Sequence, residues 1–170
     1  MSRLGQLVSY DDCKECRLCC WFTKYELWET PVITDIKRAF IKEKYPETQF
    51  VSREQGGSLF VMKETAAADK KYSDIADDIV FDCPMLDKTG CKLGQEKPFE
   101  CSIWPYRIMS QEDKLLISVS TLCKPMCENS LEKVISHLKS GLAKEISDYA
   151  KTNPGIIKEY NDGYPILMYI

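Results

Sequence analysis

Four cysteines stand within eight residues near the start of the chain, at Cys13, Cys16, Cys19 and Cys20. The motif Cys-x-x-Cys occurs twice in this run, and a chain with this spacing can fold back so that both sulfurs face one point. One Cys-x-x-Cys motif supplies half the ligands of a tetrahedral zinc site. Three cysteines in the pattern Cys-x-x-Cys-x-x-Cys resemble the segment that binds three corners of a 4Fe–4S cluster. The spacing therefore predicts a metal site, and inert buried or disulfide-linked cysteine is the less favoured alternative.

The adjacent pair Cys19-Cys20 constrains how the ligands are shared. Neighbouring side chains point to opposite faces of an extended chain and diverge by about 100° in a helix. These two cysteines are therefore awkward ligands for one metal. We expect them to serve two neighbouring centres, or two metals of one larger cluster.

The five remaining cysteines follow later in the chain, at Cys83, Cys91, Cys101, Cys123 and Cys127. Asp87–Gly90 begins with Asp and ends with Gly, which is a type I turn signature, so we expect Cys83 and Cys91 to come close enough to share a centre. Prolines on both sides of Cys101 stiffen its backbone. The last two cysteines supply one or two further ligands. Nine is an odd count, which a closed set of disulfides does not explain.

The chain has 170 residues, of which 44% are hydrophobic and 29% are charged. These values predict one globular domain, residues 1–170, with residues 155–170 as a C-terminal tail. The net charge of −3 gives no electrostatic basis for nucleic-acid binding. Neither the N-terminus nor any later run has the apolar length of a signal peptide or a membrane span. We therefore expect a cytoplasmic protein with no membrane association, whose thiols stay reduced.

Two segments carry helical patterns. Thr30–Pro31 is a helix start, with Thr as N-cap and Pro at the first helical position, and this helix should run to about Tyr45. Asn129 and Glu132 fit a capping box, and apolar residues recur at helical spacing over a long stretch after them. Gly141 weakens this longer helix midway.

Other segments have the character of strands. Turn residues at 55–57 and 111–114 predict two hairpins, and shorter strands are expected at residues 21–28 and 79–81. Residues 64–78 are expected to form a loop or a short helix. The apolar tail, Tyr164–Ile170, suggests an edge strand or a segment that docks on another subunit. The predicted fold class is α+β, a small metal-stapled domain with two main helices and short β-hairpins; a mainly α fold with cysteine-rich loops is the alternative.

The cysteine pattern extends beyond the first run. It reads Cys-x-x-Cys-x-x-Cys-Cys, then Cys-Pro-x-Leu, then Gly-Cys, then Pro-x-x-Cys-x-x-aromatic-Pro. The residues that carry it are Cys13, Cys16, Cys19, Cys20, Cys83, Pro84, Leu86, Gly90, Cys91, Pro98, Cys101, Trp104 and Pro105. This pattern resembles the YkgJ-type cysteine-cluster family, which is described as a zinc- or iron-chelating domain.

The resemblance covers residues 13–20 and 83–123, and the helix start at residues 30–35 is also similar. It implies metal binding, with Cys123 as the last family cysteine and Cys127 as an additional one. The chain departs from the family at Lys97, where the family has Arg, and at Trp104, where the family has Phe or Tyr. Lysine keeps the charge but lacks the guanidinium fork, so a bidentate contact is lost at that position.

All nine cysteines are candidate metal ligands. About eight thiolates suggest two four-cysteine centres or one larger cluster, and one arrangement groups Cys13, Cys16 and Cys19 with one distal cysteine. Thiolate-only sites suit both zinc and iron–sulfur clusters. The repeated Cys-x-x spacing favours iron–sulfur, and a 4Fe–4S cluster in particular, over zinc.

Three functions follow from this chemistry. The first is an iron–sulfur module for electron transfer or for support of a partner enzyme, which implies a protein partner. The second is a structural zinc-binding adaptor. The third and least favoured is an enzyme, in which either a four-cysteine metal site with one open position acts as a Lewis acid or Cys127 acts as a thiolate nucleophile. The sequence carries no nucleotide-binding motif, and its one histidine, His137, lies off the apolar stripe and is expected to be solvated.

Overall fold

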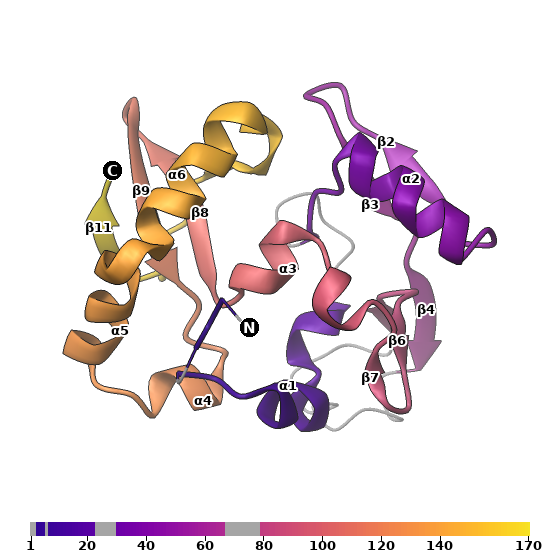
Figure 1. Ribbon diagram of the computed structural model, residues 1–170, viewed down its shortest axis with the longest axis horizontal. Coiled ribbons are helices and arrows are strands. Elements are labelled where there is room, and N and C mark those ends of the chain that lie inside the picture. The colour runs from indigo at the N-terminus through magenta and orange to yellow at the C-terminus, as the bar shows by residue number, and fades with distance from the viewer. Residues whose placement is uncertain (1–2, 6, 23–29, 67–78) are drawn as a thin grey trace. The chain divides into compact units, whose positions relative to one another are not determined.

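The computed structural model describes residues 3–5, 7–22, 30–66 and 79–170 (Figure 1). Backbone contacts group the chain into two compact units, residues 13–98 and residues 1–12 together with 99–170. Both units combine helices with short sheets, so the α+β class is confirmed and the mainly α alternative is wrong. In the described part of the chain, no helix has the length and apolar character needed to cross a membrane.

In the unit of residues 13–98, the main helix is α2 (Asp35–Lys44). It ends at Lys44 with Tyr45 as its C-cap, in agreement with the predicted end at about Tyr45. It begins after Thr34, whose hydroxyl accepts a hydrogen bond from the Lys37 N–H at 3.3 Å. The predicted start at Thr30–Pro31 is wrong. Residue Ile33 forms an antiparallel bridge with Ser58 instead, with N···O distances of 2.7 and 2.8 Å, and this pairing holds the segment extended.

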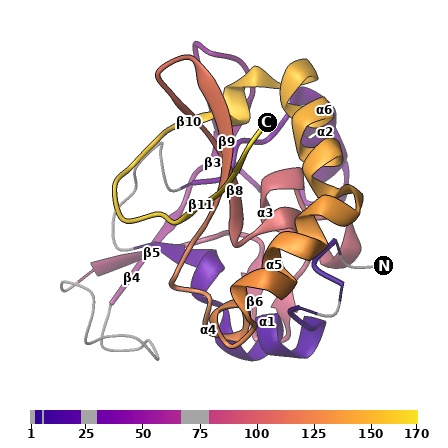
Figure 2. The same cartoon turned by 90° about the vertical axis from the view of Figure 1, so that its left-hand side faces the viewer.

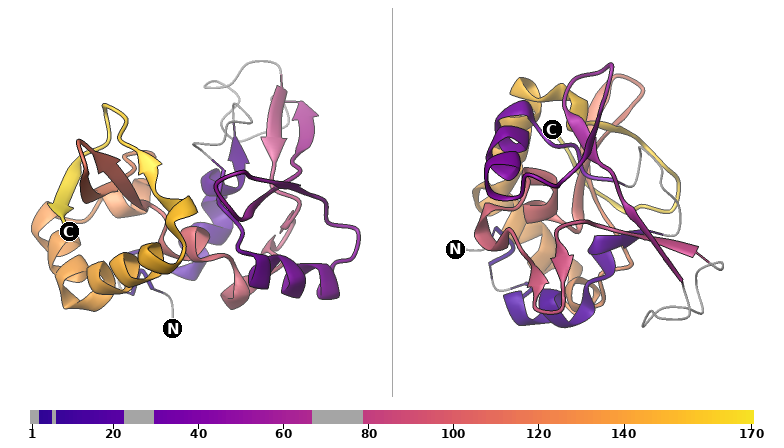
Figure 3. Two further views of the ribbon diagram at one scale, coloured as in Figure 1. Left: turned by 90° about the horizontal axis from the view of Figure 1, so that it is seen from above. Right: turned by 90° about the vertical axis from the view of Figure 1, so that its right-hand side faces the viewer.

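The hairpin predicted around residues 55–57 is confirmed as β2 (Phe50–Ser52) and β3 (Ser58–Phe60). Helix α2 lies alongside this hairpin (Figure 3). Their apolar side chains share one core, whose buried members are Phe22, Ile33, Ile41, Phe60, Met62, Met85 and Leu93. The turn depends on Gly57, which has φ +72; a Cβ there would lie 2.8 Å from Val32 Cγ1.

A three-stranded antiparallel sheet in the same unit has the order β1-β5-β4. Its strands are β1 (Trp21–Phe22), β5 (Ile79–Asp82) and β4 (Lys63–Ala66). The strand predicted at 79–81 is confirmed, whereas the loop or helix predicted from residue 64 is wrong as far as residue 66. The rest of that segment, 67–78, and residues 23–28 of the predicted first strand lie outside the described residues.

A small hairpin follows, β6 (Leu86–Asp87) with β7 (Gly90–Cys91). Asp87 Oδ1 accepts hydrogen bonds from the N–H and the hydroxyl of Thr89, each at 2.7 Å. The turn predicted from Asp87 and Gly90 is therefore confirmed, and its geometry comes from local side-chain chemistry.

In the other unit, a four-stranded sheet has the order β10-β8-β9-β11. The predicted hairpin is confirmed as β8 (Tyr106–Gln111) and β9 (Lys114–Val119). Strand β11 (Ile166–Tyr169) runs antiparallel to β9 at one edge, as expected for the tail, and β10 (Lys158–Glu159) runs parallel to β8 at the other.

Helices α5 (Leu131–His137) and α6 (Ala143–Thr152) lie along one face of this sheet (Figure 2). The single long helix predicted here is divided by a π-helical segment, Leu138–Leu142, in which Gly141 has φ +131. The N-cap is Ser130 rather than the predicted Asn129, whose side chain instead donates to Leu7 O at 3.0 Å and Pro125 O at 2.8 Å.

Candidate metal centre

The nine cysteines divide between the two units. No disulfide joins them, and all nine lie in the described residues. Those in the unit of residues 13–98 are Cys13, Cys16, Cys19, Cys20, Cys83 and Cys91. Those in the other unit are Cys101, Cys123 and Cys127.

The first cysteine run folds back on itself at Arg17. Helix α1 (Tyr10–Cys16) ends there, and a 3-10 turn, Leu18–Cys20, follows. Arg17 has φ +58, in the left-handed region, and its N–H donates to Cys13 O at 3.0 Å. The predicted reversal of the chain between the cysteines therefore depends on one residue in an uncommon backbone conformation.

The Arg17 side chain also holds this run in place. Its Nε donates to Lys14 O at 2.8 Å, and its Nη2 donates to Lys88 O at 2.7 Å. The second bond fastens the first cysteine run to the β6–β7 turn. Nothing in the spacing of the cysteines singles out this residue, so the sequence reasoning missed it.

The thiols of Cys19 and Cys20 lie side by side, with 3.9 Å between their sulfurs. The expectation that these side chains point apart is wrong, because the 3-10 turn does not set neighbouring side chains on opposite faces as an extended chain does. Tetrahedral zinc with Zn–S bonds of about 2.3 Å places its sulfurs about 3.8 Å apart. The observed spacing therefore suits two thiolates on one ion.

Strand pairing brings the second cysteine region to this pair. Strand β1 pairs with β5 in the register Trp21↔Asp82. The N–H of Cys83 donates to the carbonyl oxygen of Cys20 at 2.8 Å. Both Cys83 and Cys91 pack against the apolar core of this unit.

The pKa values of two of these thiols are raised by burial and by the neighbouring thiols. The neighbouring Cys20 thiol, followed by burial, raises the pKa of Cys19 well above its usual range. The pKa of Cys83 is raised to about 12, chiefly by burial and also by the thiols of Cys91 and Cys19, while the Met85 N–H and Lys92 act in the opposite direction. The raised pKa values favour the protonated thiols, and a thiol must lose its proton before it can serve as a metal ligand.

The donor chemistry fits a thiolate metal site, but the described geometry is open. Among the residues that the structure describes, no group of three or more His, Cys, Asp or Glu side chains converges tightly enough to hold a metal ion. The sulfurs of Cys19 and Cys20 instead form one close pair. The Cys16 thiol contributes to the raised pKa of Cys19, and the thiols of Cys91 and Cys19 contribute to the raised pKa of Cys83.

The other unit holds its three cysteines in a different setting. Cys101 lies in α3 (Phe99–Ile103) and is half-buried. Cys123 is buried and precedes α4 (Lys124–Cys127), and its carbonyl oxygen accepts the Cys127 N–H at 3.0 Å. Cys127 is exposed, and its thiol donates to Thr121 O at 3.3 Å.

The histidine predicted to be solvated is partly buried in this unit. Nε2 of His137 lies 2.9 Å from the carbonyl oxygen of Arg3. Its ring also lies 6.4 Å from the Tyr106 ring, between centroids. These contacts hold the terminal segment against α5.

Comparisons with protein-family models, with curated proteins and with solved structures found no match.

Proposed function

We propose that this protein binds a metal through cysteine thiolates, with a centre built on the unit of residues 13–98. The observation that carries the proposal is the 3.9 Å separation of the Cys19 and Cys20 sulfurs. The Cys83 N–H···O bond to Cys20, at 2.8 Å, brings a thiol from the later region to the same place. The resemblance to the YkgJ-type family adds support from the spacing of the cysteines.

The chain supplies a protected setting for such a centre. Cys83 and Cys91 are partly buried and pack beside the apolar core. The pKa values of Cys19 and Cys83 are raised overall, and the positive charges of Lys97 and Lys92 partly offset this because they stabilise the respective thiolates. An iron–sulfur cluster supplies one-electron transfer when bound, and zinc supplies a cross-link.

An iron–sulfur module is the first candidate, because Cys13, Cys16 and Cys19 have the spacing that wraps cluster corners. In this form the protein carries electrons or supports a partner enzyme, and it works with a protein partner. A cytoplasmic location suits it, because thiols stay reduced there.

A structural zinc adaptor is the second candidate, and one specific observation favours it. The close sulfur pair suits two thiolates on one ion, whereas each corner of a 4Fe–4S cluster takes one cysteine. In this form the metal stabilises the unit, and its surface binds the partner.

The test is anaerobic purification followed by an absorbance spectrum and elemental analysis on one sample. A brown protein with about four irons and matching sulfide per chain supports the first candidate, and a colourless protein with about one or two zincs supports the second. A chain that holds neither metal, even after reconstitution with each, contradicts both.

A matched pair of variants locates the centre. Cys20→Ser removes one member of the close sulfur pair and should lower the metal content. Cys127→Ser removes an exposed thiol in the other unit and should leave it unchanged. Equal metal loss in both variants contradicts the assignment to residues 13–98.

A further inference from the structure

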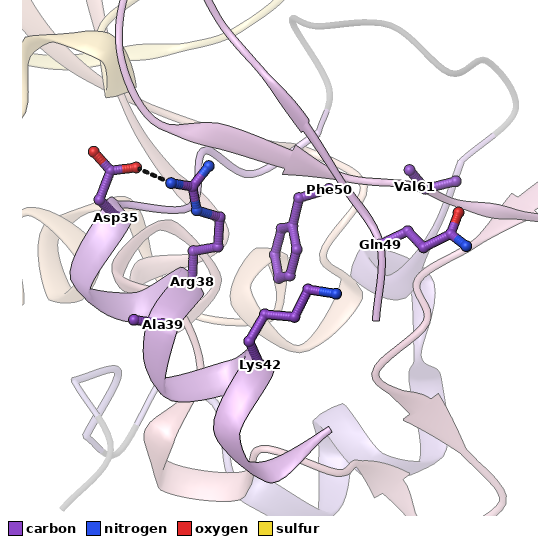
Figure 4. Close-up of a pocket in the computed structure, with 7 residues that line it drawn as sticks. All are labelled: Asp35, Arg38, Ala39, Lys42, Gln49, Phe50 and Val61. Atoms are coloured by element: carbon purple, nitrogen blue, oxygen red, sulfur yellow. Dashed lines mark ion pairs between the residues drawn. The ribbon is translucent and has the colours of Figure 1, made fainter. Parts of the chain in front are cut away.

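A surface cavity of about 530 Å³, widely open to solvent, lies beside helix α2 and contains none of the cysteines (Figure 4). Its polar lining comes from Asp35, Arg38 and Lys42 on α2 and from Gln49 just before β2, and its aromatic lining from Phe50. All its walls belong to the unit of residues 13–98. Cavities that bind small molecules have volumes of roughly 300–1,000 Å³, so this one is large enough for such a ligand.

The two cations of the cavity stand one helical turn apart on α2. The Arg38 guanidinium is fixed by Asp35 Oδ1 at 3.1 Å from Nη2 and by Ser58 Oγ at 3.0 Å from Nη1. Lys42 Nζ donates to Pro46 O at 3.0 Å. A guanidinium has five N–H donors and an ammonium has three, so both groups keep donors for a further acceptor.

The charge of the lining favours an anion. Two cationic side chains face one carboxylate, and the single carboxylate is already engaged by Arg38. A guanidinium fork matches the oxygens of a phosphate, and a lysine ammonium adds a point charge beside it.

The aromatic wall favours a ligand with a flat ring. Phe50 is half-buried, and its ring stands 5.2 Å from that of Phe60, between centroids, which supports it from within the core. Figure 4 shows the Phe50 ring between the side chains of Arg38 and Lys42. An aromatic side chain beside cations is an arrangement on which nucleobases stack.

We propose that this cavity binds a nucleoside monophosphate, or a compound of the same class in which a flat ring carries a phosphate. Arg38 and Lys42 bind the phosphate, and the ring of the ligand stacks on Phe50. Gln49, also in the lining, offers an amide to polar groups of the ligand, and Asp35 holds the Arg38 guanidinium in place. This binding is independent of the proposed metal centre.

The test is isothermal titration calorimetry of the full chain, with its metal content unchanged, against adenosine monophosphate, adenosine, inorganic phosphate and benzoate. Adenosine monophosphate should bind at least about tenfold more tightly than adenosine or phosphate, because it alone presents both parts. No saturation at about 10 mM, equal affinity for phosphate, or tighter binding of benzoate overturns the proposal.

Two lysines of the same helix provide the matched variants. Lys42→Met removes a cation from the cavity and should weaken binding of adenosine monophosphate about tenfold, the usual effect of losing one charge-assisted hydrogen bond. Lys44→Met removes a charge whose ammonium lies 4.4 Å from the Phe40 ring, outside the cavity, and should change binding less than about twofold. Equal weakening in both variants shows non-specific attraction and overturns the proposal.

Discussion

The backbone N–H of Cys83 donates a hydrogen bond to the carbonyl oxygen of Cys20, at 2.8 Å. This bond continues the pairing of β1 with β5 by one step, so it places the end of one cysteine run at the start of the next. Backbone hydrogen bonding therefore joins the two cysteine regions in the described structure.

The conformation of Arg17 gives a first prediction. Arg17→Ala and Arg17→Gly both lose the bonds to Lys14 O and Lys88 O, but only alanine retains the cost of φ +58. We expect the glycine variant to be more stable than the alanine variant by about 1 kcal/mol. Denaturant unfolding of both measures this difference, and a more stable alanine variant contradicts the left-handed geometry.

Metal removal should loosen one region selectively. If thiolates cross-link the Cys19–Cys20 turn with Cys83 and Cys91, chelation should speed amide hydrogen exchange across residues 83–91. The hairpin β8–β9 in the other unit serves as the internal control and should not change. Unchanged exchange at 83–91 after verified metal loss counts against a centre there.

The turn of the β2–β3 hairpin gives a steric prediction. A Cβ at Gly57 would lie 2.8 Å from Val32 Cγ1 and 3.0 Å from Ile33 O, whereas one at Gly56 meets nothing within 4 Å. Both glycines have positive φ, so each alanine variant carries backbone strain. Gly57→Ala should be less stable than Gly56→Ala by about 1–3 kcal/mol in thermal or denaturant unfolding. Equal stability shows that the neighbouring chain moves aside.

Tyr106 should give the other unit a pH dependence. Burial raises the pKa of Tyr106 above its usual value of 10, and its hydroxyl donates to Val134 O at 3.2 Å. A folded-state pKa above the unfolded value means that the stabilisation is complete below pH 10 and is lost as the pH rises towards the folded-state pKa.

The measurement compares two tyrosine-to-phenylalanine variants. Tyr106→Phe should cost about 1 kcal/mol at pH 7 through the lost hydrogen bond, and it should flatten the decline of stability above pH 10. Tyr169→Phe changes a side chain that is 55% exposed and should leave both values close to those of the parent chain. A parent-like decline in the Tyr106→Phe variant contradicts the role of this phenol.

Local chemistry explains which elements were predictable. Asp87 and Gly90 specify their own turn, and the end of α2 follows from Pro46. The predicted helix starts are wrong because each helix has two possible N-cap residues nearby. These are Thr30 and Thr34 for α2, and Asn129 and Ser130 for α5. Tertiary contacts decide each case, through the Ile33–Ser58 bridge and the Asn129 bond to Leu7.

The candidate site was predictable in composition but not in arrangement. Residue spacing makes Cys13, Cys16, Cys19 and Cys20 candidate ligands, and it predicts the approach of Cys83 to Cys91. The pairing of β1 with β5 has no local cue, because it joins segments far apart in the sequence. The positive φ of Arg17 has none either, because such positions usually favour glycine or asparagine.

The pairing of Trp21 with Asp82 also has a consequence during protein synthesis. The first cysteine run leaves the ribosome roughly sixty residues ahead of Cys83, which at about 5–20 residues per second is an interval on the order of several seconds. During that interval four thiols are present without the strand that completes their surroundings. The proposed centre therefore cannot be completed before translation has passed Cys91, because Cys83 and Cys91 are not yet present.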